Sequence, residues 1–396
     1  MAPESENVRT MTPPPGFDAE SSSPLWRSIA PMGPGLYIHV PFCVRRCPYC
    51  DFYSVSALDL IPRYIEALTI EAAAAAKDWP APFDTLYIGG GSPSLLNREG
   101  LEGLLKALAP LNLSKLSEFT LEANPEDVSE EQADLWAGAG VTRLSLGLQS
   151  LDERWLGDVL GRGHSVEQSR RAAEILKKRP YDLSLDMIYA LPSQQPEDWG
   201  TDLLRAAELE PDHISTYSLT VEPGTPLARS IDEKYLPPPP PQEKVADMFL
   251  ISRQALEGKG FYRYEVSNFA RPGHESRHNL KYWRREPYLG LGPAAHSFDG
   301  QKRWGNLPSV RQWLSALASG AAPRAFMEVI DEKAARLETV MLGLRLPEGL
   351  PEAVLAEAPK LDDFIKSGHL IRSEGRIRPT EIGLLVADRL AVELTE

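Results

Sequence analysis

Short apolar runs alternate with longer amphipathic segments through the first half of the chain. The segments between the apolar runs are predicted helices, because they contain helix-forming residues, N-terminal capping residues or a glycine at the end. They span residues 61–77, 98–109, 129–138, 165–178 and 196–208. The apolar runs have the length and continuous apolar character of buried strands, at residues 36–40, 85–88, 119–123, 143–148, 183–188 and 213–219. Because each helix must return the chain to the same end of the sheet, this alternation predicts six parallel strands. The pattern indicates an α/β fold, either an open doubly wound sheet or a partial barrel of six βα units. In both, the working surface lies at the C-terminal ends of the strands.

The two ends of the chain depart from this alternation. Residues 1–34 are rich in Pro, Ser, Gly and acidic residues with almost no periodicity, which predicts a disordered leader. The βα units therefore occupy residues 35–235. Residues 236–309 begin with a stiff proline run and predict a barrel extension: a long helix over 244–259, then a loop-rich stretch from 272 onward.

Residues 310–396 have a different, mostly helical character. A hairpin is expected at residues 370–379, with a turn around Gly375, before a final helix near 381–394. This pattern resembles a winged-helix module. The acidic last helix gives no reason to expect DNA binding, so packing is the expected role.

Net charge, the length of apolar stretches and cysteine content argue against several classes of protein. The net charge of −14 over 396 residues argues against a general binder of nucleic acids or anionic membranes. No stretch approaches the ~20 apolar residues of a membrane-spanning helix, and the N-terminus lacks a signal-peptide pattern. Three clustered thiols suit a reducing compartment, so a cytoplasmic location is expected.

All three cysteines of the chain lie within eight residues, at Cys43, Cys47 and Cys50. An odd, clustered set is not a disulfide framework and is more typical of ligands for one metal centre. A four-iron cluster takes four thiolates, so a cluster on this loop would leave one iron without a cysteine ligand. The alternatives are a zinc site completed by a histidine and a set of small buried apolar side chains. The flanking Arg45 and Arg46 would stabilise thiolates.

The stretch from Tyr37 to Cys50, with cysteines spaced three and then two residues apart, resembles the signature of radical S-adenosylmethionine (SAM) proteins. The resemblance implies that Cys43, Cys47 and Cys50 hold a [4Fe-4S] cluster whose open iron is chelated by SAM. It also implies a partial (β/α)6 barrel, the architecture that the six βα units predict independently.

Polar residues end several of the predicted strands, which on apolar strands is more typical of a site than of a core. The glycine run at residues 89–91 would let backbone groups approach a ligand closely, although an ordinary βα turn or a phosphate cradle has the same composition. Arg162 could equally be a surface cation. By resemblance, the positions expected to contact SAM are Tyr37, Gly90, Gly91, Ser92, Glu122, Gln149, Arg162 and Asp186.

Segments 186–192, 217–226 and 264–270 resemble the branch that contains oxygen-independent coproporphyrinogen III oxidases and HemW-type heme chaperones. Oxidases of this branch carry a fourth cysteine two residues after the third, where this chain has Phe52. The hexapeptide from His278 to Trp283 matches the HNxxYW motif of the chaperones.

By resemblance, the HNxxYW motif implies heme. His278 offers an imidazole for iron, Asn279 completes the motif, and Tyr282 and Trp283 offer flat faces for a porphyrin. On spacing alone, a capped turn is the simpler interpretation of a His-Asn pair. His296 is a second candidate near the cofactor, whereas His39 is expected to support the cysteine loop.

The resemblance thus implies a heme chaperone rather than an enzyme. It would bind a [4Fe-4S] cluster, exchangeable SAM and heme, and would pass the heme to an acceptor hemoprotein, such as a membrane-associated one. The chaperone itself would be a monomer or a homodimer. No nucleic acid is expected as a partner. The alternatives are an oxidase that decarboxylates coproporphyrinogen III by radical chemistry, and a zinc-binding scaffold.

Overall fold

Six parallel strands form the centre of the protein in the computed structural model, which describes residues 33–395. The strands are β1 (Gly35–Val40), β2 (Thr85–Gly90), β3 (Glu118–Ala123), β4 (Arg143–Gln149), β5 (Asp182–Tyr189) and β6 (His213–Ser218). They lie side by side in chain order, each parallel to the next. The predicted parallel α/β arrangement is therefore confirmed.

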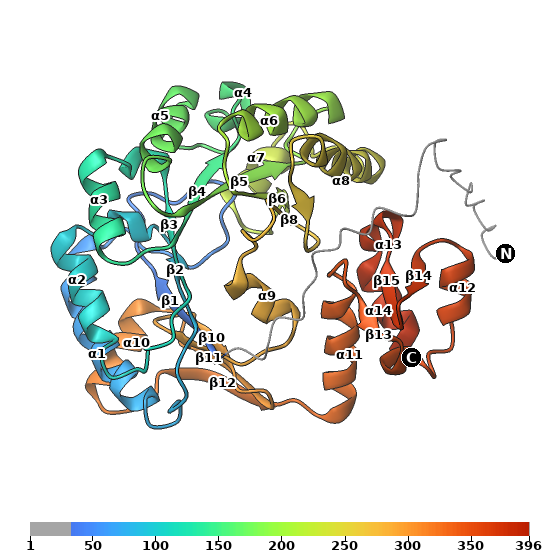
Figure 1. The fold of residues 1–396 in the computed structure, drawn as a ribbon. Helices are drawn as coiled ribbons and strands as arrows, with labels where there is room; N and C mark the ends of the chain where they lie inside the picture. Colours follow the sequence, from blue (N-terminus) through green and yellow to red (C-terminus); the bar gives the residue numbers. More distant parts are fainter. Residues whose placement is uncertain (1–32, 396) are drawn as a thin grey trace. The chain divides into compact units, whose positions relative to one another are not determined.

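Helices between the strands cover one face of this sheet (Figure 1). They are α1 (Ile61–Ala75), α2 (Arg98–Ala107), α3 (Glu130–Gly138), α4 (Glu153–Leu156), α5 (Val166–Leu176) and α6 (Pro196–Glu208). Alternate residues of β1, Leu36 and Ile38, are fully buried in the core that includes Tyr64 of α1. Strand geometry puts Tyr37 and His39 on the opposite, inner face of the sheet.

Further strands extend both edges of the sheet. One edge gains β9 (Tyr288–Leu291), β10 (His296–Phe298), β11 (Lys302–Asn306) and β12 (Arg324–Val329), and the other gains β8 (Asn268–Ala270) and β7 (Tyr262–Arg263). Strand β9 runs parallel to β1, and the outer strands are antiparallel. Within residues 33–395, β12 and β7 remain the two ends of the sheet, so the barrel is partial.

The remaining helices near the sheet are α7 (Pro226–Asp232), α8 (Gln242–Glu257), α9 (Arg277–Trp283) and α10 (Val310–Ala318). Short 3-10 turns occur at Leu58–Leu60, Pro93–Leu95, Pro125–Asp127 and Glu352–Leu355. None of the helices described in residues 33–395 is long and apolar enough to cross a bilayer.

Two parts of the structure differ from expectation. The stretch 272–308 was expected to be loop-rich but contains α9 and three strands, each too short to show a clear period of two. The expected domain boundary at residue 310 falls inside the barrel region: Trp313 of α10 packs on Tyr64 with ring centroids 5.5 Å apart, and β12 pairs with β11. The predicted leader lies outside the described residues, except Gly33 and Pro34.

The C-terminal module has its own core, built from Val340, Leu355, Leu370, Ile377 and Leu390 among others. Its elements are α11 (Glu332–Gly343), β13 (Leu350–Pro351), α12 (Leu361–Lys366), β14 (Leu370–Ser373), β15 (Arg376–Pro379), α13 (Glu381–Leu385) and α14 (Ala387–Thr395). The expected hairpin is β14–β15, and the expected final helix is divided at Val386. A small helical module with a wing-like hairpin is therefore confirmed.

Candidate metal centre

The cysteine loop leaves the C-terminal end of β1 and folds back on itself. The N–H of Cys43 donates to the carbonyl oxygen of Val55 (3.1 Å), and the N–H of Cys50 donates to that of Cys47 (3.1 Å). All three thiols are free and half-buried. Burial raises the pKa of Cys50, and so do the neighbouring Cys47 and Cys43 thiols. The loop thus presents all three thiols at the C-terminal end of β1.

A chain of hydrogen bonds joins two of the cysteines through the ends of the neighbouring strands. Ser92 Oγ donates to Cys43 Sγ (3.6 Å), and Asn124 Nδ2 donates to Ser92 Oγ (2.9 Å). Arg162 then donates from Nη2 to Asn124 Oδ1 (2.6 Å) and from Nη1 to Cys47 Sγ (3.5 Å). Donors to sulfur favour thiolate ligands and orient them.

Asn124 is the member of this chain that sequence reasoning missed. Its signal was its position, because it directly follows β3 at the same sheet edge as Ser92. Arg162 donates directly to Cys47 Sγ, in addition to the two arginines expected beside the thiols. Arg45 donates to the carbonyl oxygen of Gly161, and Arg46 to that of Cys50 (3.0 Å).

The glycine run after β2 packs against the backbone of the cysteine loop. A Cβ on Gly91 would lie 2.6 Å from the carbonyl oxygen of Phe42, and Gly90 has a φ of +110° that favours glycine. The N–H groups of Gly91 and Ser92 donate to the carbonyl oxygens of Val40 (2.8 Å) and Phe42 (2.7 Å). These glycines are therefore needed to bring the end of β2 against the loop that carries the cysteines.

Two carboxyl groups on the inner face of the sheet lie beside the glycine run. Glu122 accepts from the hydroxyl of Tyr87 (2.7 Å) and the N–H of Gly90 (3.0 Å), and Asp186 accepts from Ser145 Oγ (2.8 Å). Burial raises the pKa of both carboxyls, to about 7 for Glu122. Asp186 Oδ1 is buried without a hydrogen-bond partner in the described residues. A polar, cationic ligand group would satisfy this oxygen.

Two other expected cofactor positions lie on the same edge. Gln149, the last residue of β4, has a φ of +67°, a conformation that side chains rarely adopt outside constrained positions. The hydroxyl of Tyr37 bonds to His39 Nδ1 (3.0 Å), and His39 Nε2 bonds to the carbonyl oxygen of Tyr53 in the cysteine loop (3.1 Å). His39 thus supports the loop, as expected.

Glu122→Gln is expected to flatten the dependence of the unfolding free energy on pH. The pKa of Glu122 is about 7 in the folded protein against an ordinary 4.5, so folding favours the protonated carboxyl. The resulting stabilisation is complete below pH 4.5 and is lost as the pH rises through 7, amounting to at most about 3 kcal/mol. Urea denaturation at pH 5 and pH 8 measures it. The control is the exposed Glu167→Gln on α5, and a Glu122→Gln profile identical to wild type contradicts the prediction.

The HNxxYW segment lies at the opposite end of the strands from the cysteine loop. It forms α9, whose His278 N–H donates to Glu118 (2.8 Å), while His278 Nδ1 bonds to Thr85 Oγ1 (2.8 Å). Glu118 and Thr85 are the first residues of β3 and β2. Figure 1 shows α9 on the inner side of the sheet.

This geometry argues against the expectation that His278 presents an imidazole to heme iron. Its side chain is 1% exposed, and Nε2 bonds to the hydroxyl of Tyr282 (2.9 Å), so both ring nitrogens are occupied. Burial lowers the pKa of His278 to about 3. The backbone N–H of Asn279 donates to the capping Ser276 Oγ (3.3 Å), and Trp283 packs in an apolar cluster with Leu346. His278 is therefore part of the core in this conformation, whereas Asn279, Tyr282 and Trp283 are partly exposed.

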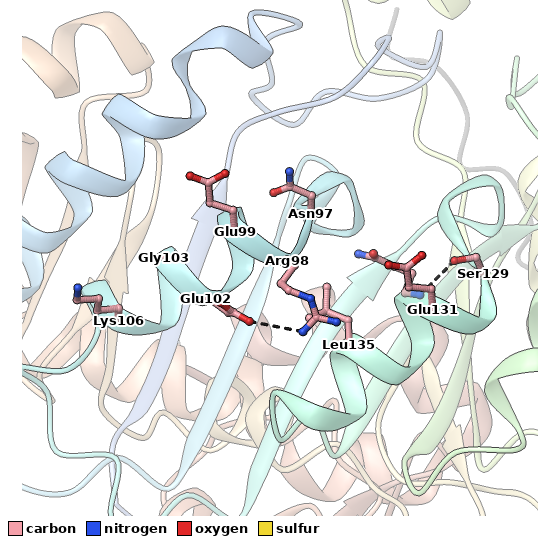
Figure 2. Close-up of a pocket in the computed structure, with 10 residues that line it drawn as sticks. Asn97, Arg98, Glu99, Glu102, Gly103, Lys106, Ser129, Glu131 and Leu135 are labelled. Carbon is pink, nitrogen blue, oxygen red and sulfur yellow. Dashed lines mark hydrogen bonds and ion pairs between the residues drawn. The ribbon is translucent and has the colours of Figure 1, made fainter.

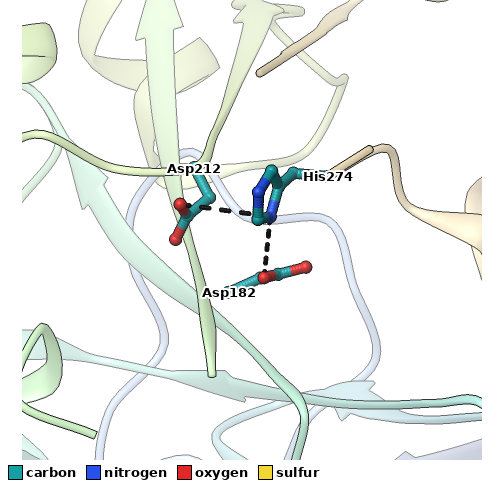
Figure 3. Close-up of side chains that lie close together, drawn as sticks. All are labelled: Asp182, Asp212 and His274. Carbon is teal, nitrogen blue, oxygen red and sulfur yellow. Dashed lines mark hydrogen bonds and ion pairs between the residues drawn. The ribbon is translucent and has the colours of Figure 1, made fainter. Parts of the chain in front are cut away.

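Two further polar features lie away from the cysteine loop: a group of two carboxylates with a histidine, and a hollow on the helical layer. Asp182, Asp212 and His274 come together at the N-terminal ends of β5 and β6 (Figure 3), where Arg143 Nη2 already donates to Asp182 Oδ2 (3.1 Å). One carboxylate of this group is therefore already paired with a cation. A hollow of about 650 Å³ lies between α2 and α3 (Figure 2), lined by mixed charges such as the Arg98–Glu102 pair (3.5 Å) on the outer helical layer.

Comparison with known proteins identifies the family. The model of the radical SAM superfamily matches residues 37–205. The heme chaperone HemW of Mycobacterium tuberculosis (strain ATCC 25618 / H37Rv) is 38% identical to this chain, over 89% of the chain and 93% of the relative. HemW of Escherichia coli (strain K12) is 33% identical, over 90% and 96%.

Among solved structures, the radical SAM enzyme coproporphyrinogen III oxidase (HemN) from Escherichia coli superposes with a TM-score of 0.79. The two chains are 22% identical over 92% of this chain and 90% of that one, which shows a common fold. The chain belongs to the radical SAM superfamily and, within it, to the family of the HemW heme chaperones.

Proposed function

We propose that this protein is a heme chaperone that carries a [4Fe-4S] cluster, binds SAM at the open iron, binds heme and passes it to an acceptor hemoprotein. The observation that carries the proposal is the hydrogen-bond chain between Cys43 and Cys47, in a protein whose relatives are named heme chaperones. The free thiols suit the reducing cytoplasm, where we place the protein.

The residues of the site fit the cluster and SAM. Cys43, Cys47 and Cys50 supply three thiolates, and such a cluster would supply one-electron chemistry and an open iron. The chain's own residues prepare the surroundings: Arg162 orients Cys47, and Asp186 offers an unpaired carboxylate oxygen. We assign contact with SAM to the inner-face positions Tyr37, Gly90, Gly91, Ser92, Glu122, Gln149, Arg162 and Asp186.

A coproporphyrinogen III oxidase is the second candidate, favoured by the likeness to HemN. Such an enzyme would bind coproporphyrinogen III beside SAM, which would supply the radical chemistry for oxidative decarboxylation of the propionate side chains. Phe52 counts against it: oxidases of this branch carry a fourth cysteine at this position, whereas the Phe52 ring here is 71% exposed and supplies no thiol.

Heme transfer assayed beside oxidase activity separates the two functions. Protein reconstituted anaerobically with iron and sulfide, then loaded with heme, is expected to convert an apo-hemoprotein such as apomyoglobin to its holo form faster than free heme in matched buffer. The same preparation, given SAM, a reductant and coproporphyrinogen III, is expected to yield no protoporphyrinogen. Turnover of coproporphyrinogen III replaces the chaperone proposal with the oxidase, and uptake of one zinc per chain instead of iron contradicts both.

A further inference from the structure

The seven histidines of the chain differ sharply in what their ring nitrogens contact. Four have both nitrogens engaged: His39, His164, His213 and His278. Two, His274 and His369, bond through Nδ1 alone, to Asp182 and to Ser367. His296 has no hydrogen bond to either nitrogen within residues 33–395, and its side chain is exposed. An incoming metal therefore finds both of its nitrogens free.

His296 stands beside an exposed aromatic ring on the inner face of the sheet. It pairs with Gly305 of β11, and Gly305 pairs with Phe326 of β12, so the three residues form one row across three strands. The next residue along β11, Trp304, lies on the other face and packs against Trp79. The His296 and Phe326 rings meet edge to face with centroids 5.5 Å apart, and Phe326 is 43% exposed.

The strand that carries His296 is tied to the strand that leads into the cysteine loop. Ser297 Oγ accepts from the N–H of Gly290 (2.9 Å), and Gly290 pairs with Tyr37 of β1. The loop before His296 touches the end of β1, since a Cβ on Gly292 would lie 2.5 Å from the carbonyl oxygen of His39. His296 therefore lies level with Tyr37, an expected SAM-contact position, on the inner face of the sheet.

We propose that His296 is the axial ligand that this chain offers to heme iron, with the Phe326 ring against the porphyrin. The assignment rests on the proposed chaperone function and specifies its cargo site. A neutral imidazole and a flat apolar ring are the groups that heme needs from a protein surface. Burial and the nearby Arg303 lower the pKa of His296, which favours the neutral, metal-binding form.

The other two partly free histidines differ from His296 in their surroundings, although His369 also meets an aromatic ring, that of Phe364, edge to face. His274 lies between two carboxylates, Asp182 and Asp212, and no aromatic ring within residues 33–395 packs against it. His369 belongs to the C-terminal module rather than to the sheet that bears the cysteine loop. Among the described residues, His296 alone combines two free ring nitrogens with an aromatic neighbour on the inner face of the sheet.

Spectroscopy of heme-loaded variants tests the assignment without any transfer assay. In His296→Gly, heme affinity is expected to fall at least tenfold and the magnetic circular dichroism of histidine-ligated heme to disappear. Free imidazole is expected to restore that spectrum by occupying the vacated position. Phe326→Ala should weaken affinity while keeping the ligation spectrum, because it removes the contact with the ring alone.

His369→Gly is the matched control and should bind heme as wild type does. An unchanged ligation spectrum in His296→Gly overturns the assignment while leaving the chaperone proposal standing. A wild-type protein that takes up no heme overturns the proposed function, and the assignment with it. His296 and Phe326 are exposed, so their replacement should leave the far-ultraviolet circular dichroism unchanged and lower the Tm only slightly, since glycine within a strand is only mildly destabilising.

Discussion

Cys47→Ser is expected to empty the metal centre. After anaerobic reconstitution, iron should fall from about four atoms per chain to near zero, and the broad absorbance near ~400 nm should be lost with it. Only three thiolates are present, so losing one leaves two ligands for a cluster that already lacks a fourth cysteine. The change also replaces the sulfur to which Arg162 donates with a serine hydroxyl oxygen, which can still accept that hydrogen bond but is a poor ligand for iron. Iron and sulfide analysis with electron paramagnetic resonance of the reduced protein measures the loss.

The control for this change lies in the same loop. Val44 is 66% exposed, and Val44→Ala should bind iron as wild type does. Retention of four irons in Cys47→Ser would falsify the three-thiolate centre. Retention of a single tightly bound divalent metal in the wild type would instead indicate a zinc site.

Arg143→Met is expected to lower the free energy of unfolding by about 3–5 kcal/mol, because it leaves buried charges without their partner. The guanidinium is 4% exposed and lies between Glu118 (3.5 Å) and Asp182 (3.1 Å). It also donates to the carbonyl oxygen of His274 (2.9 Å). Since Glu118 accepts the backbone N–H of His278, the change should loosen α9 from the strand starts as well.

Urea denaturation followed by circular dichroism measures the loss, and the midpoint should fall while the slope stays constant. Arg154→Met is the control, because it removes an arginine whose side chain is 65% exposed and pairs with Asp152 at the surface. Equal losses in the two variants contradict the prediction. Hydrogen exchange should further show α9 amides less protected in Arg143→Met than in wild type.

Much of the barrel follows from sequence because its signals are local. Most of the six strands carry a short apolar segment, and most helices start at a capping side chain, such as Asn97 before α2 or the Ser165–Gln168 capping box of α5. The strands β9 to β12 lacked such a signal. They have three to six residues each. Strand β9 pairs with β1 although the two are far apart in the sequence, and a local sequence pattern cannot predict such a pairing.

The site shows the same division. The cysteines, the glycine run and the polar strand ends could be found along the chain because each occurs at a recognisable place in a βα unit. Asn124 gains its role only from Ser92 and Arg162, which lie 32 and 38 residues away in sequence. The HNxxYW motif identified the family, yet the packing of His278 against Thr85 could be seen only in three dimensions.

The position of β1 between β2 and β9 determines when this strand can complete its hydrogen bonding during synthesis. Its neighbour β2 follows soon after it, but its other neighbour, β9, begins at Tyr288, about 240 residues after Cys50. At ordinary rates of translation, about 5–20 residues per second, that interval lasts roughly 10 to 50 s. During this time one edge of β1, the strand that leads into the cysteine loop, lacks its partner strand β9. The strand that leads into the cysteine loop therefore cannot complete its hydrogen bonding until residues 288–291 have been synthesised.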